Sequence, residues 1–173
     1  MTIAFLDALS LGNFPGIKKL EQFGKVDYYD YSTPQQALSR VSQVEIIVTN
    51  KVLIDRQLID HAPNLRLVCI SATGMNNVDL EYAASKGISV KNVTGYSSAS
   101  VSQSAFAGLL YLMHQCQYYD NFTKSGKYSN HTLFTHIGPS FHELDQMTFG
   151  VIGLGNIGRR TASIARGFGC KVV

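Results

Sequence analysis

FGVIGLGNIGR, residues Phe149–Arg159, is the stretch that decides how the second half of the sequence folds. An apolar run, Thr148–Ile152, leads into it and predicts a β-strand, while Arg159–Phe168 has the spacing of an amphipathic helix. Gly169 ends that helix, and Cys170–Val173 is apolar again. The sequence therefore predicts a strand, a glycine-rich turn, a helix and the start of another strand.

The glycines at positions 153, 155 and 158 have the GxGxxG spacing of a dinucleotide-binding turn. Gly153 permits the tight turn, Gly155 lets a diphosphate approach the backbone, and Gly158 lets the helix lie close to the strand. The diphosphate is expected on the free N–H groups at the helix start, around Asn156 and Ile157. A plain strand-to-helix turn is the alternative, but the flanking strand and helix favour the dinucleotide.

The predicted cofactor is NAD or NADP. A dinucleotide-binding unit also has an acidic residue about 20 residues beyond the last glycine, where it binds the adenosine ribose. The sequence reaches Val173 before that distance, so its residues do not distinguish the two cofactors.

Residues 1–96 predict a separate α/β unit. Short runs that are apolar throughout alternate with helical patterns, which is typical of a parallel sheet covered on both faces. The predicted strands are Ile3–Leu6, Val26–Tyr29, Glu45–Thr49, Leu65–Ser71 and Ile88–Val93. The predicted helices are Pro15–Phe23, Pro34–Val41, Asp55–His61 and Leu80–Lys86, the last capped by Asp79 and ended by Gly87. The expected fold is a doubly wound, flavodoxin-like unit.

Residues 97–173 have a different sequence pattern from residues 1–96. Ala99–Tyr119 predicts one long helix, in which small residues between the apolar ones permit close packing, and Asn121–Lys127 continues it. A polar, aromatic loop covers Tyr128–His142 before the glycine-rich segment. This half is therefore expected to be a long helix followed by the first part of a Rossmann domain.

Composition excludes several classes of protein. Hydrophobic residues make up 45% and charged residues 16%, which favours a packed core over disorder. The net charge is +3 without a basic cluster, which argues against nucleic-acid binding. No apolar stretch is long enough for a membrane span, and the N-terminus lacks the basic leader of a signal peptide. The three cysteines lack the spacing of a metal site and suggest reduced, buried thiols in a cytoplasmic protein.

Four ordered segments give the sequence a specific resemblance. It resembles the D-isomer-specific 2-hydroxyacid dehydrogenases over essentially its whole length, close to the glycerate dehydrogenase and hydroxypyruvate reductase branch. The segments are Thr49–Lys51, Ser71–Asp79, Asn92–Ser98 leading into Val101-Ser102-Gln103, and VIGLGNIGR. The resemblance implies a substrate domain at residues 1–96, then a hinge helix, a dimerisation segment and the start of an NAD(P)-binding domain at residues 97–173.

The resemblance also implies site residues. Thr73, Gly74 and Met75 follow a strand, where a glycine turn can receive a substrate carboxylate; a simple turn before Asp79 is the alternative. Asn50 and Lys51 end a strand at the same sheet edge and are implied as further substrate contacts, although a lysine there is more often just solvated.

Ser98 and Val101 match positions near the nicotinamide in this family. On its residue type alone, Ser98 is an N-cap of the long helix, and both roles are compatible. None of the five histidines occupies a catalytic position of the family. Catalysis there uses an arginine, an acid and a histidine, all of which we expect beyond Val173, so that no catalytic residue is assigned in this chain.

The expected activity is NAD(P)-dependent hydride transfer between a 2-keto acid, such as hydroxypyruvate or glyoxylate, and a D-2-hydroxyacid. The chain itself is expected to be a truncated, inactive portion that binds a dinucleotide weakly at best. A homodimer through residues 100–145 is implied by the family. The alternative is a non-catalytic, dimerising or dinucleotide-sensing relative, like the corepressors of the same fold.

Overall fold

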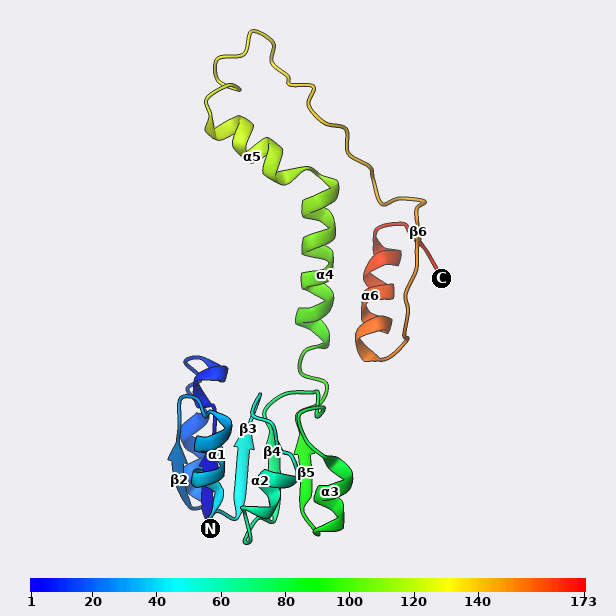
Figure 1. Ribbon diagram of the computed structural model, residues 1–173. Helices are drawn as coiled ribbons and strands as arrows, with labels where there is room; N and C mark the ends of the chain where they lie inside the picture. The colour runs from blue at the N-terminus through cyan, green and yellow to red at the C-terminus, as the bar shows by residue number, and fades with distance from the viewer. The chain divides into compact units, whose positions relative to one another are not determined.

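Five parallel strands form the sheet of the first half of the computed structural model, which describes residues 1–173 (Figure 1). The strands are β1 (Thr2–Phe5), β2 (Lys25–Tyr28), β3 (Ile46–Thr49), β4 (Leu67–Ile70) and β5 (Ser89–Asn92). Their order is β2-β1-β3-β4-β5, and every pairing is parallel. All five carboxyl ends therefore lie at one edge, and the predicted α/β fold is confirmed.

Successive residues of each strand pack on opposite faces of this sheet. Ala4 and Leu6 contribute to the larger core, which α1 (Pro34–Val41), α2 (Arg56–Asp60) and α3 (Leu80–Ser85) cover. Ile3 and Phe5 join a smaller core on the other face. That core is completed by two 3-10 helices, η1 (Ala8–Leu11) and η2 (Ile17–Phe23).

Side-chain caps fix where the helices of this half begin. Thr33 and Gln36 form a reciprocal capping box at α1. Asp55 accepts from the N–H of Leu58 at 2.9 Å, and Asp79 accepts from the N–H of Tyr82 at 2.9 Å. The predicted cap at Asp79 is thus confirmed, as is the end of α3 at Gly87, which has a φ of 73°.

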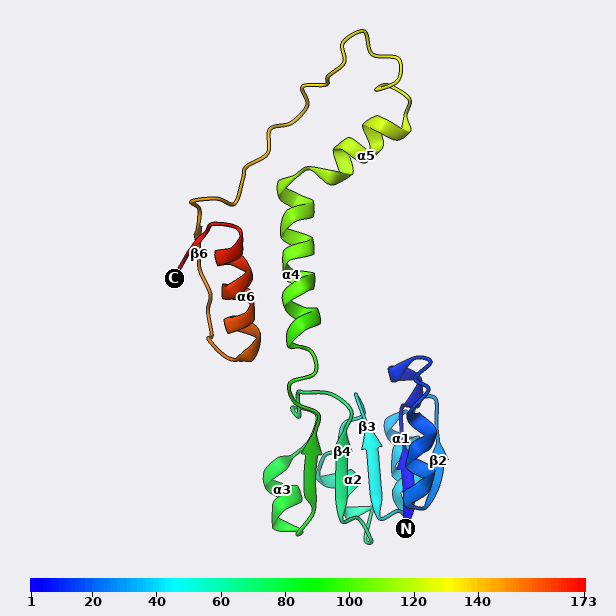
Figure 2. The same cartoon turned by 180° about the vertical axis from the view of Figure 1, so that it is seen from behind.

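The second half contains three helices and a pair of short parallel strands. These elements are α4 (Ser98–Met113), α5 (Cys116–Lys124), β6 (Thr148–Phe149), α6 (Asn156–Gly167) and β7 (Lys171–Val172). Helix α4 runs beside α6 in both views (Figures 1 and 2). Phe106 of α4 stacks on Phe149 and Phe168, with ring centroids 5.6 and 5.5 Å apart, and forms the centre of this half's core.

The predicted long helix Ala99–Tyr119 is wrong as a single element. Gln115 adopts a left-handed conformation with a φ of 52°, which ends α4 and separates it from α5. Glutamine rarely takes this conformation, so the sequence carries no clear sign of the break. The predicted helix at Pro15–Phe23 is a 3-10 helix instead, and Ile17 and Leu20, three residues apart, pack on the sheet.

Two further expectations need correction. Helix α6 begins at Asn156, three residues before the predicted start, because the last glycine of the fingerprint is already helical. The cysteines are not uniformly buried: Cys170 is buried, Cys69 is half-buried and Cys116 is exposed. Burial raises the pKa of the Cys69 thiol.

Contacts divide the chain into two compact units, Met1–Thr94 and Gly95–Val173. In neither unit is a helix long and apolar enough to cross a membrane. No group of three or more histidine, cysteine or carboxylate side chains gathers in a way that would hold a metal ion.

Candidate functional site

The conformation of the loop after β3 is held by a buried carboxylate, which lies just beyond the end of β1. Asp7, only 6% exposed, accepts hydrogen bonds from the backbone N–H groups of Asn50 and Lys51, at 2.9 and 2.6 Å, and from the Thr49 hydroxyl at 3.0 Å. The Thr49 hydroxyl in turn accepts from the N–H of Val52 at 3.0 Å. The backbone donors at Asn50, Lys51 and Val52, the first three residues of this loop, are therefore used within the protein.

The loop after β4 differs from the loop after β3 in the use of its backbone N–H groups. No backbone N–H group from Thr73 to Asn77 donates a hydrogen bond within the protein. Thr73 and Gly74 are exposed and Met75 is half-buried. Successive N–H groups without acceptors in a turn can receive an anion. It lies at the carboxyl end of a parallel strand, where ligands of open α/β sheets bind.

Side chains tie these two loops to each other and to the end of β5. The Asn77 amide donates to the Val52 carbonyl at 3.0 Å, and the N–H of Ile54 donates to the Asn77 carbonyl at 2.8 Å. The Thr73 hydroxyl donates to the Val93 carbonyl at 3.1 Å, and the Asn92 amide donates to the Thr73 carbonyl at 2.6 Å. The structure thus brings the predicted residues Asn50, Lys51, Thr73, Gly74 and Met75 to one edge of the sheet.

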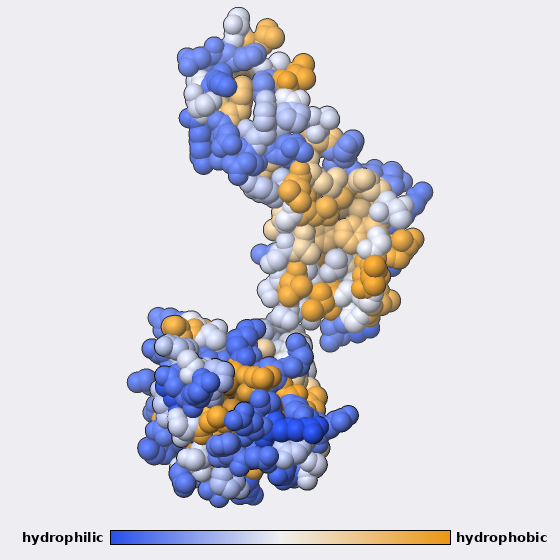
Figure 3. Space-filling model, in the orientation of Figure 1, coloured by the Kyte–Doolittle hydropathy of each residue, from blue (hydrophilic) through white to orange (hydrophobic).

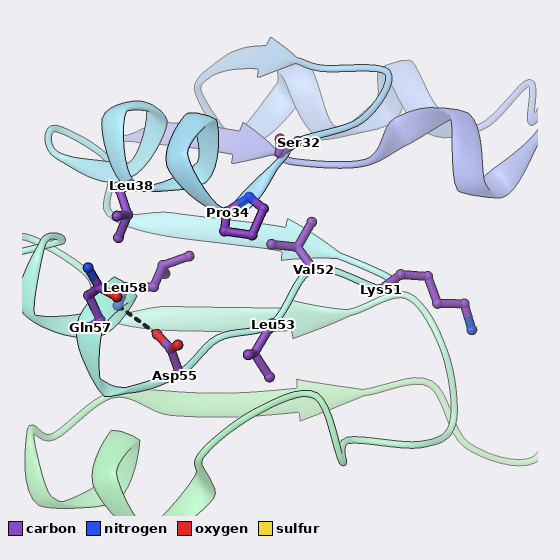
Figure 4. A pocket seen from close by; sticks show the side chains of 9 residues that line it. All are labelled: Ser32, Pro34, Leu38, Lys51, Val52, Leu53, Asp55, Gln57 and Leu58. Atoms are coloured by element: carbon purple, nitrogen blue, oxygen red, sulfur yellow. Dashed lines mark hydrogen bonds between the residues drawn. The ribbon is translucent and has the colours of Figure 1, made fainter.

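A pocket of about 260 Å³ lies between the starts of α1 and α2, next to Lys51. Its walls are mostly apolar and include Pro34, Leu38, Val52 and Leu58. Figure 4 shows the Lys51 side chain extending away from Leu38 and Leu58. Because Lys51 is exposed and absent from the ion pairs of the structure, its ammonium group is available to an anion.

The glycine-rich turn has the geometry that its spacing predicts. Gly153 has a φ of 93°, which favours glycine. Nothing lies within 4 Å of the position that a Cβ atom would take on Gly155, whereas a Cβ on Gly158 would collide with the Gly153 carbonyl oxygen. The Arg159 guanidinium braces the turn by donating to the Leu154 carbonyl at 2.8 Å and to the Asn156 side chain at 2.7 Å.

This turn suits a dinucleotide diphosphate. Helix α6 begins at Asn156 with no side-chain cap, so its first N–H groups have no acceptor of their own. The open space at Gly155 lets an anion approach them, and the positive end of the helix dipole favours negative charge there. Gly153, Gly155, Asn156, Ile157 and Gly158 therefore form one compact candidate site.

The first turn of α4 lies against this candidate site. The hydroxyl of Ser102, which is fully buried, donates to the Ser98 carbonyl at 2.8 Å and approaches the Ile157 carbonyl at 3.4 Å. Val101 is 43% exposed. Ser98 is not the N-cap that its residue type suggests. Ser97 precedes the helix in a helical conformation and makes no side-chain cap, so Ser98 is the first helical residue.

The model of one known protein family matches most of this chain. The model of the D-isomer-specific 2-hydroxyacid dehydrogenase catalytic domain matches residues 3–162. The chain belongs to this family. The resemblance seen in the sequence is therefore confirmed.

Two curated relatives match this chain from end to end. A hydroxypyruvate reductase of Blautia hydrogenotrophica is 35% identical, and a glycerate dehydrogenase of Methylorubrum extorquens is 28% identical; they cover 100% and 99% of the chain. The chain spans 55% and 54% of their own lengths, and so about half of the curated relatives it matches.

Two solved structures show the same fold. An acyclic imino acid reductase in complex with NADPH and D-Arg matches with a TM-score of 0.85 at 25% identity over 99% of this chain and 55% of its own. A D-lactate dehydrogenase from Aquifex aeolicus, complexed with NAD and lactic acid, matches with a TM-score of 0.83 at 24% identity over 99% of this chain and 50% of its own.

Some residues of these sites give no signal of their role in the sequence. Asp7 lies in an apolar run and gives no sign of the loop that it holds, because its partners are more than 40 residues away. Arg159 and Ser102 stand within segments that sequence analysis singled out, but their hydrogen bonds depend on the packing of α4 against α6 and on the turn.

The histidines do not gather at either candidate site. His114 follows α4 and stacks on Phe141, with ring centroids 5.0 Å apart. His136 is half-buried: its ring stacks on Phe122, and its Nε2 atom lies 2.9 Å from the Tyr118 hydroxyl. These contacts hold the loop after α5 in place.

Apolar side chains remain exposed around the glycine-rich turn. Ile152 and Leu154 are 106% and 62% exposed, and Figure 3 shows hydrophobic residues gathered on the surface of the α4 and α6 region. Further along the chain, Phe134 and Ile137 are 98% and 92% exposed.

Proposed function

We propose that the protein is an NAD(P)-dependent oxidoreductase that interconverts a 2-keto acid of the hydroxypyruvate or glyoxylate type and the corresponding D-2-hydroxyacid. The observation that carries the proposal is the pair of complementary anion sites, one in each unit. The row of free N–H groups at Thr73–Asn77 suits a carboxylate, and the start of α6 suits a diphosphate. Relatives named as hydroxypyruvate and glyoxylate reductases support the substrate class.

The geometry of the two sites and the resemblance to the family together support the following roles. Residues 1–96 form the substrate domain, in which the N–H groups of the Thr73-Gly74-Met75 turn bind the substrate carboxylate and the side chains of Asn50 and Lys51 approach the same anion. Residues 97–173 contribute a hinge helix, a dimerisation segment and the start of the nucleotide-binding domain. There, Gly153, Gly155, Asn156, Ile157 and Gly158 hold the diphosphate, while Ser98 and Val101 lie near the nicotinamide.

When bound, the reduced nicotinamide supplies a hydride to the carbonyl carbon of the keto acid, and a proton adds to the carbonyl oxygen. The residues described here bind and orient the two reactants. No side chain among them is assigned the proton transfer, because no histidine lies among the residues of either candidate site. We also propose a homodimer through residues 100–145, supported by the exposed Phe134 and Ile137 in that segment.

Turnover of keto acids by the complete gene product tests the proposal. We expect oxidation of NADH or NADPH with hydroxypyruvate or glyoxylate, a D-configured product with hydroxypyruvate, and a clear preference for one of the two cofactors. Lys51→Met should raise KM for the keto acid about tenfold, the effect of losing one charge-assisted contact. Lys19→Met, which changes an exposed lysine on η2, is the matched control. Cofactor binding without turnover of any 2-keto acid would favour a dinucleotide-sensing relative instead.

A further inference from the structure

We infer that Asp7 is a positioning residue for the substrate: it holds the loop after β3 in the conformation that presents Lys51 and Asn50. This inference rests on the proposed function for its consequence in catalysis. Asp7 lies just beyond β1, and β1 is the direct neighbour of β3 in the sheet. Its carboxylate therefore reaches the end of β3 from the side, without covering the exposed face of the loop.

The side-chain hydrogen bonds of Asp7 are all made with the last residue of β3 and the first two residues of the loop that follows. Its two oxygens receive the N–H groups of Asn50 and Lys51 and the hydroxyl of Thr49. Asp7 also precedes η1, but its side chain makes no cap there. It takes part in none of the ion pairs of the structure. A buried carboxylate without a cation is retained only where such donors compensate its charge.

The two adjacent loops therefore offer different groups to the substrate. Asp7 takes up the N–H groups of Asn50 and Lys51, so that these two groups are not available to a substrate carboxylate, whereas the N–H groups at Thr73–Asn77 in the β4 loop make no hydrogen bond within the protein. At Asn50 and Lys51 the β3 loop then contributes side chains. The Oδ1 atom of Asn50 is buried without a hydrogen-bond partner, so the group of Asn50 that can donate to a carboxylate is its amide NH₂. Asp7 thereby fixes the backbone position from which the Lys51 side chain extends.

The test compares Asp7→Asn with Asp30→Asn in the complete gene product. The first change keeps the shape of the side chain but removes its charge and replaces one acceptor oxygen with an NH₂ group. The second makes the same change at an exposed aspartate that follows β2 at the same sheet edge. Two measurements are made: hydrogen exchange of the Asn50 and Lys51 amides, and the steady-state constants for the keto acid together with the dissociation constant for the dinucleotide.

We expect Asp7→Asn to accelerate exchange of both amides at least tenfold and to raise KM for the keto acid about tenfold. Neither kcat nor the dinucleotide dissociation constant should change more than twofold. Asp30→Asn should leave all four quantities as they are. If Asp7→Asn does not fold, Thr49→Val removes only the hydroxyl link. It should accelerate exchange at Val52 and raise KM by a smaller factor.

Unchanged exchange in Asp7→Asn would overturn the inference, because the loop would then hold its conformation without the carboxylate. Faster exchange with an unchanged KM would also overturn it, provided that Lys51→Met raises KM in the same assay. If the wild-type protein turns over no 2-keto acid, the proposed function fails, and the inference that Asp7 positions a substrate loop fails with it. Exchange then still decides whether Asp7 holds the loop.

Discussion

Gly158 lies so close to Gly153 that a Cβ atom on Gly158 would collide with the Gly153 carbonyl oxygen. The collision involves backbone, which cannot rotate away as a side chain does. Gly158→Ala should therefore destabilise the second unit by at least about 2 kcal/mol, the cost of overpacking a tight contact. Chemical denaturation measures this loss. Gly167→Ala is the control, because it lies on the same helix with nothing within 4 Å of its added Cβ and should be neutral or slightly stabilising. Equal stability of the two variants would contradict the role given to Gly158.

Gly155 differs from Gly158 because its Cβ position is open and its φ of −72° suits any residue. Gly155→Ala should still fold, losing about 0.5–1 kcal/mol because alanine is a poorer residue than glycine at the position before a helix. The new methyl group would occupy the space through which the diphosphate approaches the helix start. We expect the dinucleotide dissociation constant to rise at least tenfold, measured by calorimetry on the complete gene product. An unchanged dinucleotide dissociation constant would mean that the diphosphate does not bind at this turn.

These two glycines illustrate what the sequence predicts well. GxGxxG between a strand and a helix predicts the turn, because both neighbouring elements are local. The five strands were predictable for a similar reason: β1, β3 and β4 are short apolar runs, and β2 and β5 lie in segments with apolar residues between turn residues. The loop after β3 was not predictable. Its conformation depends on Asp7, and no local pattern pairs Asp7 with Lys51, which is 44 residues away. The break at Gln115 was missed because a glutamine there gives no signal of a left-handed conformation.

Asp79 makes the free energy of unfolding of the first unit depend on pH in the acidic range. The N–H of Tyr82 and then the guanidinium of Arg56, whose Nε atom lies 3.0 Å away, hold the pKa of the Asp79 carboxyl below its usual 3.8. A lowered folded-state pKa means that this stabilisation is present above about pH 4 and is lost as the pH falls through the folded-state pKa.

Asp79→Asn keeps an oxygen that can cap α3 but cannot titrate, so its unfolding midpoint should fall less steeply below pH 4 than that of the wild type. Urea unfolding at a series of pH values measures the difference. Asp30→Asn, which changes an exposed aspartate without a side-chain partner, provides the reference slope. Parallel slopes for wild type and Asp79→Asn would show that the cap and the Arg56 pair add no acid dependence.

Gln115 offers a way to stabilise the junction of α4 and α5. Its left-handed backbone, with a φ of 52°, is unfavourable for a residue with a Cβ atom but costs glycine little. Gln115→Gly should therefore stabilise the second unit by roughly 0.5–1 kcal/mol, even though glycine is more flexible in the unfolded chain. The same change at Gln117, which lies within α5 and is helical, should destabilise by about 1 kcal/mol. Gln117→Gly also removes the side-chain hydrogen bonds of Gln117 with Tyr111 and Asn121, so its loss of stability includes more than the backbone effect. Destabilisation by Gln115→Gly would mean that α4 and α5 form one continuous helix in solution.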